Sequence, residues 1–184
     1  MTTPKSSANP GPLGLLGFGM TTVLLNLHNA GIIPLSVVIV SMGFALGGLA
    51  QIIAGVLEFK GGNTFGGTAF TAYGCFWWSL IFIWIAPFGL TAADKLSMGF
   101  YLLLWFVFTA MMFVGTLKHN RITQVVFFSL AALFLLLALG DFTHNEGITH
   151  FAGWVGIFCG SSAIYSAVGQ IVNSEFGKTI IPLG

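Results

Sequence analysis

The chain has 184 residues, of which 56% are hydrophobic and only 6% are charged, with a formal net charge of +1 and a mean hydropathy of +0.94. Soluble domains carry about 25% charged residues, so this chain has too few charged groups to cover the surface of a soluble globular protein. The composition excludes a cytosolic enzyme and a disordered regulator. It also excludes a nucleic-acid-binding protein, because there is no basic excess to neutralise phosphate. We expect an all-α integral membrane protein.

Charged residues divide the chain into apolar segments. Between Lys5 and Glu58 lie 52 residues without Lys, Arg, Asp or Glu, and four further charge-free runs of 19 to 33 residues follow. A membrane-spanning helix needs about 20 apolar residues, and the longest run holds two helices separated by turn-forming residues between His28 and Pro34. The sequence therefore predicts six transmembrane helices, at Leu13–Asn29, Leu35–Leu57, Gly66–Ala86, Ser97–Leu117, Ile122–Leu139 and Ile148–Val172.

The loops between these spans are short, so we expect a single six-helix transmembrane domain over residues 1–184, with an N-terminal segment at 1–12 and a short C-terminal tail at 173–184. Cytoplasmic loops are enriched in Lys and Arg. The side that holds both termini carries five such residues, and the opposite side carries one, Lys95. Both termini are therefore predicted to be cytoplasmic, in a multi-pass protein of the cell inner membrane. The five residues are Lys5, Lys60, Lys118, Arg121 and Lys178.

Ionisable side chains inside a membrane usually mark a proton or ion path, and here they occur only near the ends of spans. Glu58 lies at the inner end of the second span and His28 at the outer end of the first, which makes them the two candidates for proton coupling. The sequence shows no activated nucleophile and no metal-ligand spacing. We therefore predict no enzymatic activity, no metal and no cofactor, and we interpret Cys75 and Cys159 as packing residues.

The first span has an unusual start and a polar face. Asn9-Pro10-Gly11-Pro12-Leu13-Gly14-Leu15 predicts an abrupt helix start, because Pro12 suits a first turn but cannot continue a helix backwards. Its free N–H groups, with those of the third and fifth spans, would attract an anion at the cytoplasmic face. Further along, Thr21, Thr22 and Asn26 share one face with Phe18. Two interpretations of this face stay open: packing between helices, or the lining of a polar passage, because an amide in hydrocarbon is costly without a partner.

Small residues recur at intervals of four in the second span, at Gly43, Gly47, Gln51 and Gly55. The sixth span carries a similar series of glycines, Gly153, Gly156 and Gly160. Such spacing lets helix backbones approach closely. We interpret both series as packing or subunit surfaces and not as the lining of a substrate path.

The N-terminal string and several later ones resemble the acetate uptake transporter family, to which the bacterial succinate–acetate permeases belong. The family signature NPAPLGL corresponds to residues 9–15, with Gly11 in place of the alanine. Further similar strings are Gly62-Asn63-Thr64-Phe65-Gly66, Phe127-Phe128-Ser129-Leu130, His150-Phe151-Ala152-Gly153-Trp154 and Ser162-Ala163-Ile164-Tyr165. The resemblance implies a homohexamer in which each protomer has its own pore for acetate and, in some members, succinate. It also implies an apolar constriction formed by Phe18, Tyr73 and Leu130.

The functional hypothesis is therefore transport of small carboxylate anions across the lipid bilayer. Bare transfer of a carboxylate into hydrocarbon is prohibitive, so neutral donors must replace water; the candidates are Thr21, Thr22, Asn26 and the Tyr73 hydroxyl. Acetate or succinate as the preferred substrate, and channel-like or proton-coupled transport, stay open. The alternative is a neutral-solute channel of the water or glycerol type, suggested by six helices and an Asn-Pro motif. Such channels carry two of these motifs at the midplane, whereas this chain has one near its N-terminus.

Overall fold

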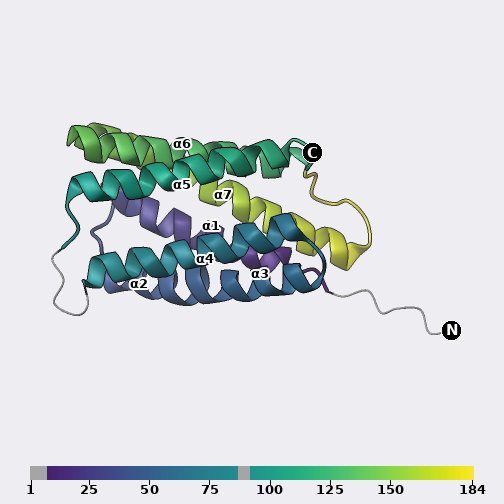
Figure 1. The fold of residues 1–184 in the computed structure, drawn as a ribbon. Helices are drawn as coiled ribbons and strands as arrows, with labels where there is room; N and C mark the ends of the chain where they lie inside the picture. Colours follow the sequence, from purple (N-terminus) through teal and green to yellow (C-terminus); the bar gives the residue numbers. More distant parts are fainter. Residues whose placement is uncertain (1–7, 87–91) are drawn as a thin grey trace.

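All regular secondary structure is helical in residues 8–86 and 92–184, the parts of the chain that the computed structural model describes (Figure 1). The first long helix is α1 (Gly11–Asn29). A continuous helix over Val37–Lys60 follows, composed of α2 (Val37–Met42), a π-helical segment η1 (Gly43–Ala50) and α3 (Gln51–Lys60). The remaining helices are α4 (Thr64–Ile85), α5 (Lys95–Thr116), α6 (Arg121–Thr143) and α7 (Glu146–Phe176).

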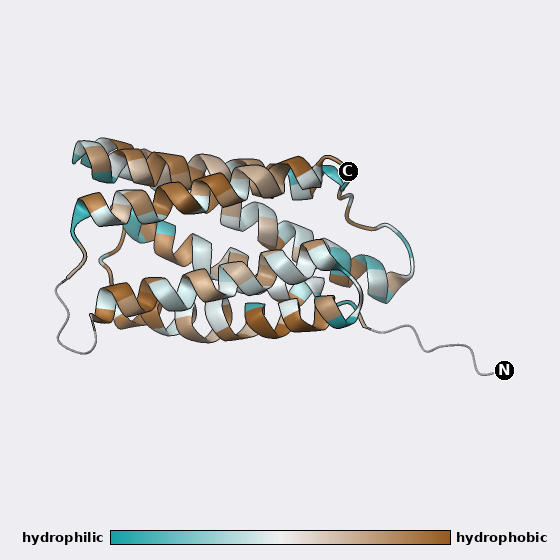
Figure 2. Ribbon diagram, viewed as in Figure 1, coloured by the Kyte–Doolittle hydropathy of each residue, from teal (hydrophilic) through white to brown (hydrophobic). Residues whose placement is uncertain are grey.

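Each predicted span coincides with one of these long helices, but their apolar character differs. Within the described ranges five helices are long and apolar enough to cross a membrane: Val37–Lys60, α4, α5, α6 and α7. Helix α1 is not among them, since it carries Thr21, Thr22 and Asn26 in its second half. All three side chains are at most 3% exposed, so α1 is an interior helix whose polar groups face its neighbours. Hydrophilic residues elsewhere gather towards the helix ends (Figure 2).

Successive helices run in alternate directions, so the start of α1 and the C-terminus lie at the same end of the bundle (Figure 1). We call this the terminal end; α4 and α6 also begin here. The opposite end, where α5 and α7 begin, is called the distal end. Residues 1–7 lie outside the described residues, and they include Lys5, one of the five positive charges predicted on the cytoplasmic side. Residues 87–91, between α4 and α5, lie outside them too.

Asparagine and aspartate side chains determine where four of the helices begin. Asn63, Asp94, Asn120 and Asn145 precede α4, α5, α6 and α7, and each accepts a hydrogen bond from a backbone N–H in the first turn. These residue types are preferred at this position because their side chains satisfy N–H groups that have no partner within the helix. The caps explain why the helices start slightly earlier than the predicted spans.

Three helices also extend beyond their predicted ends, and the first of them continues to Lys60 where Leu57 was predicted. Helix α6 continues to Thr143 and α7 to Phe176, so the C-terminal tail begins after Phe176 and not at residue 173. The predicted ends were taken from charged residues, and a charge near a helix end does not terminate the helix. The tail itself folds back onto the bundle: the Asn173 side chain accepts a hydrogen bond from the Ile180 N–H at 2.7 Å, and the Tyr165 hydroxyl donates to the Pro182 carbonyl at 2.7 Å.

Helices α1 and α7 pack closely through glycine. A Cβ on Gly160 would lie 2.6 Å from the carbonyl oxygen of Gly19, and a Cβ on Gly156 would coincide with the side chain of Asn26. The interpretation of the sixth-span glycines as packing residues is thus confirmed for this pair of helices. In the second span, Gly47 gives room to the Trp77 ring in the same way. Small residues therefore allow α1 to sit among its neighbours with its polar face inward.

Candidate functional site

Four cavities follow one another through the described part of the bundle. Cavity I, nearest the terminal end, has a volume of about 20 Å³, and cavity II of about 30 Å³, so cavity I has room for about one water molecule. Cavities III and IV widen towards the distal end, with volumes of about 160 and 510 Å³. Neighbouring cavities share wall residues: Leu25 and Phe76 line both II and III, and His28 and Thr149 line both III and IV. The series runs from the apolar middle of the bundle to the polar distal end.

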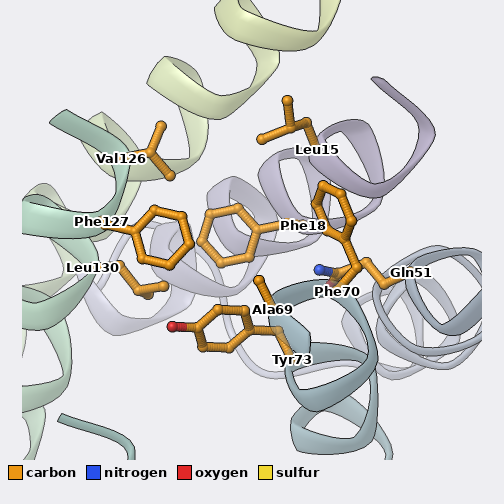
Figure 3. Close-up of a pocket in the computed structure, with 9 residues that line it drawn as sticks. All are labelled: Leu15, Phe18, Gln51, Ala69, Phe70, Tyr73, Val126, Phe127 and Leu130. Atoms are coloured by element: carbon orange, nitrogen blue, oxygen red, sulfur yellow. The ribbon is translucent and has the colours of Figure 1, made fainter. Parts of the chain in front are cut away.

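Phe18, Tyr73 and Leu130 are the three residues that line both cavity I and cavity II. They come from α1, α4 and α6, and their side chains are 6%, 3% and 3% exposed. The ring centroids of Phe18 and Tyr73 are 6.0 Å apart, and Figure 3 shows all three side chains converging with Phe127 at the wall of cavity I. The residues that the family resemblance assigns to a constriction are therefore brought together at one point between two cavities.

Aromatic rings from α5 and α6 surround Tyr73. Its ring centroid lies 5.6 Å from that of Phe108 and 5.9 Å from that of Trp105. The Tyr73 hydroxyl is 2.9 Å from the Thr109 hydroxyl, so it already has a hydrogen-bond partner on α5. The Tyr73 hydroxyl, predicted as one of the neutral donors, is thus engaged with Thr109 in this structure. Thr71 and Cys75 lie on other faces of α4 than Tyr73: Thr71 packs against Gly55, and Cys75 is exposed.

The polar face of α1 is divided between the cavities and the packing. Thr22 and Asn26 line cavity II. The Asn26 amide donates to the Thr22 carbonyl at 2.8 Å, and its oxygen accepts from the Asn29 amide at 2.9 Å, so its orientation is fixed. Thr21 lines none of the four cavities; a Cβ on Gly47 of η1 would lie 3.0 Å from its methyl carbon. Two of the three predicted donors on α1 thus reach the cavities, and the third lies between α1 and η1.

The N-terminal motif holds the start of α1 against α4 and α7. The Asn9 side chain accepts from the Gly11 N–H at 2.9 Å and donates to Gln170 at 3.1 Å, and Pro10 and Pro12 form the first turn. Leu13 is 41% exposed. Gly14 leaves room for the Phe70 ring, since a Cβ there would lie 2.5 Å from that ring, and Phe70 lines cavity I.

Glu58 occupies the place where the sequence predicted free helix N-termini. Its carboxylate accepts a hydrogen bond from the Asn63 amide at 2.7 Å, and it lies beside the starts of both α1 and α4: a Cβ on Gly11 would be 3.3 Å from Oε1, and one on Gly66 would be 3.1 Å from Oε2. A carboxylate is stabilised at this end of a helix. The Glu58 carboxyl group therefore lies beside two of the three helix starts that were expected to attract a substrate anion.

The two candidates for proton coupling lie at opposite ends of the bundle. Glu58 is 7% exposed at the terminal end and lines none of the four cavities. His28 lines cavities III and IV at the distal end, with its Nδ1 3.1 Å from the Ile33 carbonyl oxygen. Cavity IV also contains the charged residues Lys95, Asp141 and Glu146. No charged side chain lines cavity I or II in the described part of the chain.

Two residues at the site were missed by sequence reasoning. Thr109 was given no role, although a single hydroxyl in the middle of an apolar span is a visible signal. Gln51 was assigned to a packing stripe because of its spacing with glycines; the structure places it in the wall of cavity I instead. Gln51 carries an amide in an apolar span, as Asn26 does, and an amide there is costly without a partner, which is the signal that identifies it.

Five apolar helices and a series of internal cavities define a multi-pass membrane protein with a narrow, uncharged constriction. The chain belongs to the GPR1/FUN34/yaaH family, whose model matches residues 1–183. It is 58% identical over 179 residues to the succinate-acetate/proton symporter SatP of Escherichia coli (strain K12), an alignment that covers 96% of this chain and 95% of that protein. The resemblance deduced from the motifs is therefore confirmed.

A solved structure and a more distant relative extend this comparison. The structure of the bacterial acetate channel SatP superposes with a TM-score of 0.96 at 57% identity, covering 97% of this chain and 100% of that one. The ammonia transport outward protein 2 of Saccharomyces cerevisiae is 41% identical over 177 residues, covering 91% of this chain and 63% of the yeast protein. The bacterial relatives are named as a proton symporter in one case and a channel in the other.

Proposed function

We propose that this protein transports small carboxylate anions, acetate above all, through a pathway inside each protomer. The observation that carries the proposal is the wall shared by cavities I and II, where Phe18, Tyr73 and Leu130 meet. An apolar constriction of this kind sieves by size and removes water from the substrate. The names of the bacterial relatives, which refer to acetate and succinate, agree with it.

The proposal includes α1 as a sixth membrane span. Its length of 19 residues matches the thickness of the hydrocarbon core. Its polar side chains are buried against other helices and need no contact with lipid. With six spans both ends of the chain would lie on one side, and the excess of Lys and Arg there favours the cytoplasmic side. A homohexamer, as the family resemblance implies, would use the exposed apolar faces of the outer helices.

Passage proceeds by stepwise replacement of water. A carboxylate that enters through cavity IV moves from the charged distal end to the amide of Asn26 and the hydroxyl of Thr22 in cavity II. Neutral donors hold the anion weakly, which favours fast release. Cavities of about 20 and 30 Å³ have room for about one or two water molecules, so the constriction side chains must rotate to admit acetate. The apolar rings then accept the methyl group.

The charge distribution favours channel-like movement over proton coupling. Proton paths in membranes usually use carboxylate or histidine side chains, and the described residues that line cavities I and II include neither. Glu58 lies beyond cavity I, and His28 lies distal to cavity II. Succinate, with two carboxylates, faces the higher barrier at an uncharged constriction.

Flux into liposomes made with the purified protein tests the proposal. We expect saturable uptake of labelled acetate, an electrical current that reverses with the acetate gradient, and slower uptake of succinate. Glycerol or water permeability without acetate flux would instead support the neutral-solute channel. Protein-free liposomes are the control, because protonated acetic acid crosses lipid unaided; the comparison is made at neutral pH, where the carboxyl group, with a pKa of about 4, is almost fully ionised.

A further inference from the structure

Gln51 is a fully buried amide for which the described residues supply no hydrogen-bond partner. Its side chain is 0% exposed, and neither Nε2 nor Oε1 has a partner. Leaving such a group unpaired in apolar surroundings is costly, and buried polar groups in folded proteins are nearly always bonded. An amide of this kind in the middle of a membrane protein therefore indicates that a ligand supplies the missing hydrogen-bond partner.

The amide reaches cavity I from the helix that follows the π-helical segment. Gln51 is the first residue of α3, directly after η1, and η1 lies close to α1: a Cβ on Gly17 would be 2.5 Å from the Leu46 carbonyl oxygen. Figure 3 shows the amide nitrogen of Gln51 directed towards the rings of Phe18 and Phe70. The nine residues that line this cavity include two polar side chains, and the second, Tyr73, already bonds to Thr109.

We propose that Gln51 binds the carboxylate of the substrate in cavity I. The ligand is a small monocarboxylate, which accepts hydrogen bonds from the N–H groups of Nε2. A hydrogen bond to a charged acceptor is stronger than one to a neutral acceptor, and the apolar walls strengthen it further. The amide carries no charge, so the anion is not trapped. The inference rests on the proposed function, because it names a binding residue on the same pathway.

The position of Gln51 gives the pathway an amide on each side of the constriction. Asn26 lines cavity II and Gln51 lines cavity I, and the wall between the two cavities is formed by Phe18, Tyr73 and Leu130. A carboxylate that passes the constriction thus leaves one amide and meets another. The volume of cavity I, about 20 Å³, accommodates a carboxylate only when a ring of the wall, such as Phe18 or Phe70, turns aside.

The test compares Gln51→Met with the wild type in proteoliposomes. Met has a similar length and no donor, and it removes an unpaired polar group from the interior, so the variant should fold at least as well as the wild type. We expect the KM for acetate uptake to rise about tenfold or more, the loss typical of a hydrogen bond to a charged group. We also expect the increase in Tm that saturating acetate gives the wild type to be lost.

Gln124→Met is the matched control. The Gln124 amide donates to the His119 carbonyl at 3.0 Å and lines none of the four cavities, so the KM should stay unchanged. A second variant, Gln51→Leu, also removes the donor without adding a polar group and should raise the KM in the same way. If wild-type liposomes take up acetate and both Gln51 variants keep the wild-type KM and acetate-dependent Tm, the assignment of Gln51 is wrong. Absence of uptake by the wild type would instead overturn the proposed function itself.

Discussion

The hydroxyl of Tyr73 on α4 lies 2.9 Å from the hydroxyl of Thr109 on α5, and both side chains are buried. This bond crosses between two helices that are consecutive in the sequence, and it fixes the tyrosine ring whose neighbours include Phe18 and Phe127. The constriction is thus held in shape by a residue that does not itself line cavity I or II.

Thr109→Val tests the role of this bond. The substitution keeps the shape of the side chain but leaves the buried Tyr73 hydroxyl without a partner, which should cost about 1–3 kcal/mol of stability. A Tyr73 ring no longer fixed should also admit bulkier monocarboxylates. We expect a lower Tm and a higher ratio of butyrate to acetate uptake. Thr116→Val is the control, since Thr116 is equally buried on α5 but bonds to the Phe113 carbonyl of its own helix. Equal uptake ratios in the two variants would argue against a role for Thr109.

Leu130→Ala tests the wall between cavities I and II. Removing this 3% exposed side chain joins the two spaces and should widen the narrowest point of the pathway. We expect succinate and butyrate uptake to increase relative to acetate, together with a loss of about 2–5 kcal/mol of stability. Leu139→Ala, on the same helix but 41% exposed, should leave the selectivity as it is. Uptake rates of the three labelled acids in one batch of liposomes give the answer.

Gly156→Ala tests the packing that orients Asn26. A Cβ at this position would coincide with the Asn26 side chain, which lines cavity II. Overpacking of this kind typically costs about 1–3 kcal/mol, so we expect a lower Tm and slower acetate uptake by the protein that remains folded. Gly61→Ala is the control, because the nearest atom to a Cβ there is 3.4 Å away. A Gly156→Ala protein with normal uptake would show that Asn26 does not need its present orientation.

The double variant Glu58→Gln, His28→Gln separates channel from symporter. Both residues lie outside cavities I and II, so a channel should keep its acetate current and its reversal potential. Current recordings at two pH values on either side of the bilayer measure this. A complete loss of acetate flux in a folded double variant, or a wild-type reversal potential that follows the proton gradient, would establish coupled transport and contradict the channel interpretation.

The sequence predicts the helices well because composition decides most of their length. The charge-free runs locate every long helix. Asp141 and Glu175 nevertheless lie inside helices, so the ends of the charge-free runs do not mark where α6 and α7 end. The π-helical segment over Gly43–Ala50 left no signal that we recognised, since its glycines also fit regular packing.

The candidate site, too, could be predicted from the sequence only in part. Phe18, Tyr73 and Leu130 could be named from family resemblance and are adjacent in space. Thr21 and Thr22 are neighbours in sequence, yet only Thr22 lines a cavity, because consecutive residues on a helix point about 100° apart. The contact of Glu58 with the starts of α1 and α4 depends on packing between helices, which no local pattern specifies.

Acetate uptake by a Leu130→Trp variant is the most direct test of the central claim, that the anion passes between Phe18, Tyr73 and Leu130. An indole at this position fills the wall shared by cavities I and II. Liposomes with the folded variant should take up no more labelled acetate than protein-free liposomes, whereas Leu139→Trp, on the exposed face of α6, should match the wild type. Wild-type acetate uptake through folded Leu130→Trp protein would place the pathway elsewhere.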